Sequence, residues 1–167
     1  MSREQSQRFA IACLAAGVVV LVDQATKAAA LGGMSQTERI PLLGDLLGLQ
    51  LAFNPGAILS LGADFTGLLT LLGVGAVVVL VVAAARARTE TWAVGIGLIL
   101  GGAIGNVIDR LFSPPGFGVG HVTDFLAYGN LFIGNLADVA LGAGALVLGL
   151  NMWIRHRRAR AKAAEQV

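Results

Sequence analysis

The sequence predicts an all-α membrane protein with four transmembrane helices and a small extended, β-like cradle on its outer side. Of its 167 residues 56% are hydrophobic and only 13% are charged, with a mean hydropathy of +0.76. Soluble domains carry about a quarter charged residues, so the composition indicates a membrane protein. Four segments approach the about 20 apolar residues that a spanning helix needs, at 9–31, 65–85, 92–111 and 133–154. They occupy most of the chain, so residues 1–167 are interpreted as a single membrane domain.

Basic residues lie on one side of the predicted bundle if the four spans alternate in direction. By the positive-inside rule this side is the cytoplasm, which puts both termini inside and the connections 32–64 and 112–132 outside. The basic tail, 155–167, is expected to be an anchor beside anionic lipid rather than a nucleic-acid site. The residues on this side are Arg3, Arg8, Arg86, Arg88, Arg155, Arg157, Arg158, Arg160 and Lys162.

The first span contains an acid and a base, Asp23 and Lys27, four residues apart. This spacing places them on one helix face in the favourable order for an ion pair. They interrupt the apolar run before any small-residue cleavage site, so we expect a retained span rather than a cleaved signal peptide. Two interpretations remain open: a structural pair that neutralises itself inside the bundle, and a pair that braces an active site.

The connection 32–64 contains a stretch of alternating side chains that is typical of a strand. Leu49, Leu51 and Phe53 are separated by Gln50 and Ala52, and prolines argue against a continuous helix. This predicts a small sheet-like element at the outer membrane surface. Asn54 follows it in the tetrapeptide NPGA, where its amide either forms a turn or holds an extended peptide backbone.

The second span has no charged residue and is interpreted as scaffold. The third span carries Gly97, Gly101 and Gly105 at every fourth position, which leaves one face bare for another backbone or for a substrate helix. Its outward end carries three polar residues. These residues are Asn106, Asp109 and Arg110. They suit either a helix end at the membrane interface or a functional site. We favour the functional site because the three residues follow the glycine face.

The outer loop 112–132 is rich in proline and glycine, as is typical of a lid or mobile loop. His121 with Asp124 and Asp138 raises the possibility of a metal site. The chain has no helical HExxH pair, however, and its second histidine, His156, lies in the basic tail. We therefore expect neither a metal nor another cofactor.

Asp124 in this loop and Asp138 at the start of the fourth span come from separate elements at one membrane depth. Asn135 precedes Asp138 by three residues and points to the same helix face. Two neighbouring carboxylates cannot both ionise easily, so we expect them to share a proton at neutral pH. This arrangement suits an aspartyl protease, in which one acid activates water and the other polarises the peptide carbonyl.

Five motifs in order resemble one family, the prokaryotic lipoprotein signal peptidases or signal peptidase II. They are DQATK at 23–27, NPGA at 54–57, GGAIGNVIDR at 101–110, VTDF at 122–125 and NLAD at 135–138. The resemblance implies an intramembrane aspartyl endopeptidase of the bacterial cytoplasmic (inner) membrane, with its site near the outer face. Its substrates would be prolipoproteins, cut just before a cysteine that carries diacylglycerol. No nucleic-acid partner is expected, and we expect a monomer in contact with membrane lipid.

The resemblance also implies roles for individual residues. Asp124 and Asp138 match the catalytic pair. The chain departs from the family pattern at Leu59, where a phenylalanine is usual, and at Gly134, where a larger apolar residue is usual; the second departure is expected to loosen the start of the last helix. The other motif positions, which would support the pair or bind substrate, are Asp23, Lys27, Asn54, Gly56, Asn106, Asp109, Arg110, Asn135 and Ala137.

Two other classes of protein share some of these features, namely transporters or proton relays and non-catalytic membrane scaffolds. Acids inside membrane spans also mark the ion paths of transporters and proton relays. Such a path needs polar groups through the whole membrane depth, whereas the polar residues of this chain are expected in the outer half alone. A non-catalytic membrane scaffold would tolerate the loss of both Asp124 and Asp138.

Overall fold

The computed structural model describes residues 2–56 and 61–164, with side chains described as far as residue 161. Four helices are long and apolar enough to cross a membrane, which confirms the prediction of four apolar helices. They are α1 (Arg3–Gly33), α2 (Thr66–Ala85), α3 (Glu90–Phe112) and α4 (Leu136–Ala164), and a short 3₁₀ helix, η2 (Ala63–Phe65), leads into α2. The fourth helix begins at Leu136, because residues 133 and 134 of the predicted span belong to a strand.

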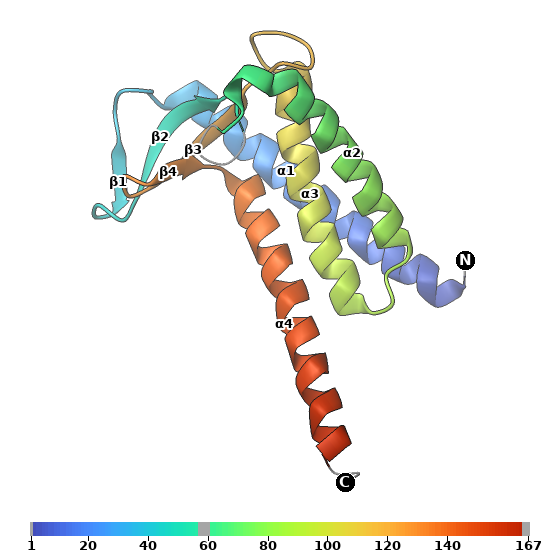
Figure 1. Ribbon diagram of the computed structural model, residues 1–167. Helices are drawn as coiled ribbons and strands as arrows, with labels where there is room; N and C mark the ends of the chain where they lie inside the picture. Colours follow the sequence, from blue (N-terminus) through green and yellow to red (C-terminus); the bar gives the residue numbers. More distant parts are fainter. Residues whose placement is uncertain (1, 57–60, 165–167) are drawn as a thin grey trace.

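Helix α3 is the centre of the bundle and contacts each of the other three helices (Figure 1). Half of its most apolar stretch is buried, against 11–17% in the other three. Thr89 is its N-cap residue, and the side chain of Thr89 accepts a hydrogen bond from the backbone N–H of Trp92. The other helices leave most of their apolar surface exposed, as lipid-facing helices do.

The glycine face of α3 lets α1 approach very closely. A Cβ atom on Gly97 would lie 2.6 Å from the carbonyl oxygen of Ala12, and one on Gly101 would lie 2.6 Å from the Cβ of Val19. The prediction that another backbone approaches this face is therefore confirmed, whereas the prediction of room for a substrate helix is wrong, because α1 already occupies the face. The small residues serve close packing inside the protein instead.

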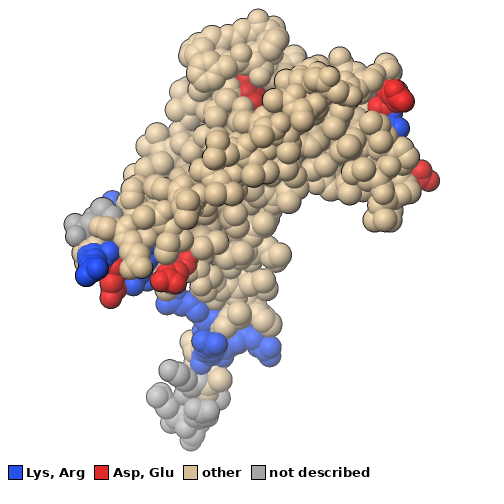
Figure 2. All heavy atoms as spheres, turned by 180° about the vertical axis from the view of Figure 1, so that it is seen from behind, with Lys and Arg blue, Asp and Glu red and all other residues tan. Residues whose placement is uncertain are grey.

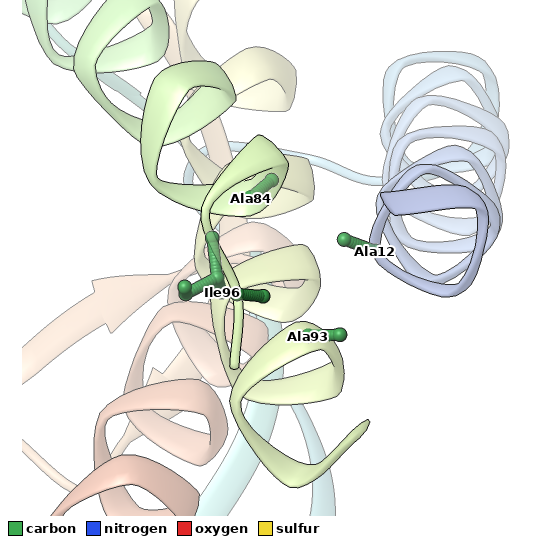
Figure 3. Packing of buried hydrophobic residues seen from close by; sticks show 5 residues of the cluster. Ala12, Ala84, Ala93 and Ile96 are labelled. Atoms are coloured by element: carbon green, nitrogen blue, oxygen red, sulfur yellow. The ribbon is translucent and has the colours of Figure 1, made fainter. Parts of the chain in front are cut away.

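Small side chains also fill the region where α1, α2 and α3 meet away from the sheet. Ala12 of α1 faces α3, and Ala84 and Ala93 lie close by with Ile96 (Figure 3). These alanines are at most 1% exposed. Close helix contact through small residues replaces the large apolar side chains of a water-soluble core, since lipid offers no hydrophobic driving force between helices.

A four-stranded antiparallel sheet lies at one end of the bundle, where α1 ends and α4 begins (Figure 1). Its strands lie in chain order, each paired with the next. The predicted sheet element is confirmed by β1 and β2, whereas β3 and β4 formed no part of the prediction. The strands are β1 (Ile40–Leu43), β2 (Leu47–Asn54), β3 (Val122–Tyr128) and β4 (Phe132–Gly134).

The missed strand β3 lies in the predicted outer loop. It was not recognised because its first four residues are all buried, so apolar and polar positions do not alternate along it. Phe125 of β3 and Leu51 of β2 pack on Ala30 of α1, with Leu136 of α4 against the same cluster. The sheet is thereby fixed to the ends of two helices.

Basic side chains gather at the end of the molecule opposite the sheet. Figure 2 shows lysine and arginine around the distal part of α4, whereas the sheet end carries few charged atoms on its surface. The start of α1 lies at this same basic end (Figure 1). The bundle is therefore polarised along its length, with the sheet at one end and the basic residues at the other.

Candidate active site

Asp124 and Asp138 come together at the sheet end of the bundle. Asp124 lies in β3, opposite Ala52 of β2, and is only 2% exposed. Asp138 lies in the first turn of α4 and is exposed. Asn135 joins them: its Nδ2 donates to Oδ1 of Asp124 at 2.6 Å, and its backbone N–H donates to Oδ2 of Asp138 at 3.3 Å.

The start of α4 is closed by a reciprocal pair of hydrogen bonds. The side-chain oxygen of Asn135 accepts from the backbone N–H of Asp138 at 3.0 Å, while the Asp138 carboxylate accepts from the N–H of Asn135. This is a capping box, in which each residue satisfies a donor that the helix leaves unpaired. A Cβ on Gly134 would lie 3.0 Å from Oδ2 of Asp138, so the departure at this position leaves room for the carboxylate. The other departure, Leu59, lies outside the described residues.

Lys27 is the centre of a buried ion cluster beneath the two acids. Its Nζ lies 2.8 Å from Oδ2 of Asp23 and 2.9 Å from Oδ2 of Asp109. The same ammonium donates to Oδ1 of Asn106 at 3.1 Å. Gln24 Nε2 donates a hydrogen bond to each of the two carboxylates, at 3.2 Å in both cases. Sequence spacing predicted the pair Asp23 and Lys27, and the structure adds the acid from α3.

Asn106 connects this ion cluster to the two site acids. Its Nδ2 donates to Oδ1 of Asp138 at 3.0 Å, and its Oδ1 accepts from Nδ2 of Asn135 at 3.2 Å. Since Oδ1 also accepts from Lys27, the amide has partners on both sides and its orientation is fixed.

Arg110 holds the turn that carries Asn54. Its guanidinium donates to the carbonyl oxygens of Pro55 and Gly56. The side-chain oxygen of Asn54 accepts a hydrogen bond from the backbone N–H of Gly56 at 3.0 Å. Asn54 therefore forms a turn, which is one of the two roles that the sequence predicted for it. Asn54 also donates a hydrogen bond to Asp124.

Burial, which is the largest cause, and the charge of Asp138 together raise the pKa of Asp124 to about 7. Hydrogen bonds from Asn135 and Asn54 and the charge of Lys27 act in the opposite direction, but burial is the largest effect. A carboxyl group that holds its proton near neutral pH is able to donate a hydrogen bond to a substrate carbonyl.

The raised pKa of Asp124 predicts a change of stability with pH. From about pH 4 to about pH 7 the folded protein holds a proton that the unfolded chain has lost, so stability falls as pH rises and then levels off. Replacing Asp124 by asparagine removes this fall. The quantity to compare is the melting temperature of Asp124→Asn minus that of the intact protein. We expect this difference to be about 5 °C larger at pH 8 than at pH 4.

Thermal unfolding in detergent at several pH values would measure this difference. The control is Asp64→Asn, because Asp64 is an exposed acid in η2 away from the cluster. A melting-temperature difference that is the same at pH 4 and pH 8 would contradict the assignment of a raised pKa to Asp124.

A cavity of about 450 Å³ opens beside the two acids. Its lining is mixed: Asn54, Arg110 and Asp124 are polar, whereas Val122 and Leu141 are apolar. A second cavity of about 320 Å³ adjoins it along β2 and β4 and shares Asn54 and Asp124 as lining residues. A peptide with both an apolar portion and a polar backbone would match this mixed lining.

The structure brings the predicted site residues to one place, around the acids or in the turn that faces them. Sequence reasoning missed Gln24, although it stands between Asp23 and Lys27 in the motif DQATK. Its signal was an amide inside a membrane span, where polar groups need partners. Within 2–56 and 61–164, no cluster of three or more metal-binding side chains is found around His121 or elsewhere.

These features define a multi-pass membrane protein with a carboxylate-bearing site at one end of its bundle. The family model described as signal peptidase (SPase) II matches residues 15–154. The chain therefore belongs to the signal peptidase II family, which is a family of proteases.

Its relatives agree with this assignment. The chain is 41% identical over 142 residues to a lipoprotein signal peptidase of Rhodococcus jostii (strain RHA1), an alignment that covers 85% of this chain and 72% of that protein. It is 46% identical over 124 residues to one from Leifsonia xyli subsp. xyli (strain CTCB07), covering 74% and 57%. A bacterial membrane enzyme solved by the in meso method at 2.3 Å resolution shares the fold, with a TM-score of 0.75, 24% identity, and coverage of 85% of this chain and 87% of that one.

Proposed function

We propose that the protein is an aspartyl endopeptidase that removes signal peptides from prolipoproteins by cutting just before a diacylglyceryl-modified cysteine. The observation that carries the proposal is the pair Asp124 and Asp138, held together by Asn135 beside a half-apolar cavity. Relatives named lipoprotein signal peptidases supply the substrate class. The alternative of a transporter or proton relay is not supported by the comparisons.

In the proposed reaction Asp124 holds the shared proton and Asp138 is the ionised acid. Asp138 takes a proton from water as the water oxygen attacks the peptide carbonyl carbon, and Asp124 gives its proton to the carbonyl oxygen. Asp138 then passes its proton to the leaving amine nitrogen, and the carbon–nitrogen bond breaks. Asp124 regains its proton from the collapsing hydroxyl, which leaves a carboxylic acid and an amine.

The burial of the two acids supports this division of roles. Asp124 is 2% exposed, and burial raises its pKa to about 7, so it is suited to keep a proton until the carbonyl needs one. Asp138 is exposed and faces the cavity, where water has access. The side-chain amide of Asn106 donates to Asp138 and that of Asn135 donates to Asp124, and these two bonds fix the rotation of the carboxylates.

The cavity supports a lipidated substrate. Acyl chains on the cysteine need hydrocarbon, while the two acids need water, and both conditions are met where a membrane meets an aqueous phase. We propose that the sheet end faces outward from the cytoplasmic membrane and that both termini face the cytoplasm. The basic residues at the opposite end support this orientation by the positive-inside rule (Figure 2).

The proposed activity is tested with the purified protein and a synthetic prolipoprotein peptide, with and without diacylglycerol on its cysteine. Mass spectrometry should show cleavage of the modified peptide at the bond before that cysteine, and no cleavage of the unmodified one. A metal chelator is expected to leave the rate unchanged. Failure to cut the modified peptide, or cleavage at another bond, would refute the proposed activity.

A further inference from the structure

Each of the two site acids follows a residue whose backbone N–H is held by a buried carboxylate. Thr123, which precedes Asp124 in β3, donates its N–H to Oδ2 of Asp109 at 3.0 Å. Ala137, which precedes Asp138 in α4, donates its N–H to Oδ1 of Asp23 at 2.9 Å. The backbone N–H groups of the two residues that precede the site acids are therefore anchored by acids of α3 and α1.

Lys27 joins these two anchors. Its Nζ lies 2.8 Å from Asp23 and 2.9 Å from Asp109, and all three charged side chains are buried, at 0–6% exposure. A continuous path thus runs from Thr123 through the ion cluster to Ala137. Gln24 donates to both carboxylates as well and holds the path together from one side.

We propose that Asp23, Lys27 and Asp109 form a positioning clamp that sets the separation between Asp124 and Asp138. The inference rests on the proposed function, in which these two acids work as a pair. The acids come from a strand and a helix, and their shared work on one water and one carbonyl needs a spacing fixed to within about 0.5 Å. The clamp provides that spacing through two backbone hydrogen bonds and one ammonium.

Charge favours a positioning role over stability alone. Asp23 by itself neutralises Lys27, so the second carboxylate, Asp109, adds a desolvation penalty that the fold does not require. What Asp109 adds is an acceptor for the backbone N–H of Thr123, the residue before Asp124. The buried charge of Asp109 is explained if its contact with Thr123 serves the reaction.

Lys27 acts through its neighbours and not on the substrate. An ammonium has three N–H donors, and these are accounted for by Asp23, Asp109 and Asn106. Its connection to Asp138 runs through Asn106, whose Nδ2 donates to that carboxylate. The three clamp residues are therefore positioning residues.

The decisive variant is Lys27→Arg, which keeps the charge and both ion pairs but is longer and planar, so it changes the spacing. Steady-state kinetics with the diacylglyceryl-modified peptide should show kcat lowered about 30-fold, because misplacement by about 1 Å has effects of this order. KM should stay within about threefold, since the cavity is untouched. A wild-type kcat in folded Lys27→Arg would overturn the inference.

A second variant covers the case in which arginine does not fit. Asp109→Asn keeps volume and leaves Lys27 paired with Asp23, so the protein should fold, and the same selective loss of kcat is expected. The control is Asn151→Leu, which removes a side-chain hydrogen bond of α3 that lies far from the acids, namely the one that Trp92 Nε1 donates to Asn151 of α4 at 3.1 Å. Equal kcat values for Asp109→Asn and the control would likewise refute the clamp.

A structural readout separates this inference from the proposed activity. If the intact protein does not cleave the lipidated peptide, the proposed function fails, and the clamp is then judged by the distance between the Asp124 and Asp138 carboxyl carbons. Crystal structures of the intact protein and of Lys27→Arg should show that this distance changes. An unchanged distance in the variant overturns the clamp whatever the activity.

Discussion

Asp124→Asn and Asp138→Asn are each expected to lower the rate of cleavage of a diacylglyceryl-modified peptide by about 10³-fold or more. General acid and general base catalysis contribute about 10²–10⁴-fold each, and an amide performs neither step. Because the two acids act as a unit, the double variant should be hardly slower than either single variant. Product formation over time, measured by mass spectrometry at saturating peptide, gives kcat directly.

The asparagine variants must be folded for this result to count. Asparagine keeps the size of aspartate. It has one acceptor oxygen fewer, however, and Asn135 donates a hydrogen bond to each acid, so the loss of such a bond could lower stability. Thermal melting establishes that each variant is folded, and Asp64→Asn serves as a control because this acid is exposed in η2. Normal cleavage by either folded variant would remove that residue from the catalytic assignment.

The four helices were predictable because length and apolar composition alone decide whether a segment spans a bilayer. The strand β2 was predictable because Leu49, Leu51 and Phe53 alternate with Gln50 and Ala52, although of these five residues only Leu51 is buried. The strands β3 and β4 were not. Val122 to Phe125 is buried on both faces, and β4 has only three residues, so neither offers a periodic signal.

The site was predictable as a set of residue types but not as a set of contacts. Asp23 and Lys27 lie four apart on one helix, and local spacing gives their pairing. The contact of Lys27 with Asp109 depends on how α1 crosses α3, which no local pattern encodes. Arg110 was predicted to support the pair or bind substrate, and no local pattern indicated that it would donate to the carbonyls of Pro55 and Gly56.

The glycine face of α3 illustrates the same limit. Spacing showed that the face is bare, but it could not show what lies against it. The structure places α1 there, and it places the carboxylate of Asp23 directly over Gly105. The glycines therefore belong to the construction of the site.

The second large effect is expected from Gly105→Ala. A Cβ atom at this position would lie 2.5 Å from Oδ2 of Asp23 and 3.5 Å from the Cβ of Ala137. The Asp23 carboxylate is held by Lys27 and by the N–H of Ala137, so it cannot move aside without losing a partner. We expect overpacking to cost about 1–3 kcal/mol and the resulting shift near the site to lower kcat about 100-fold.

The matched control is Gly75→Ala in α2, where an added Cβ would meet no atom within 4 Å. Alanine is favoured over glycine in a helix by about 1 kcal/mol at both positions, so this gain is common to the two variants. Gly75→Ala should therefore be as stable as the intact protein or slightly more so, with normal cleavage, while Gly105→Ala melts at a lower temperature. If Gly105→Ala instead matches Gly75→Ala in melting temperature and kcat, Asp23 has room to move and the close contact between α1 and α3 does not constrain the site.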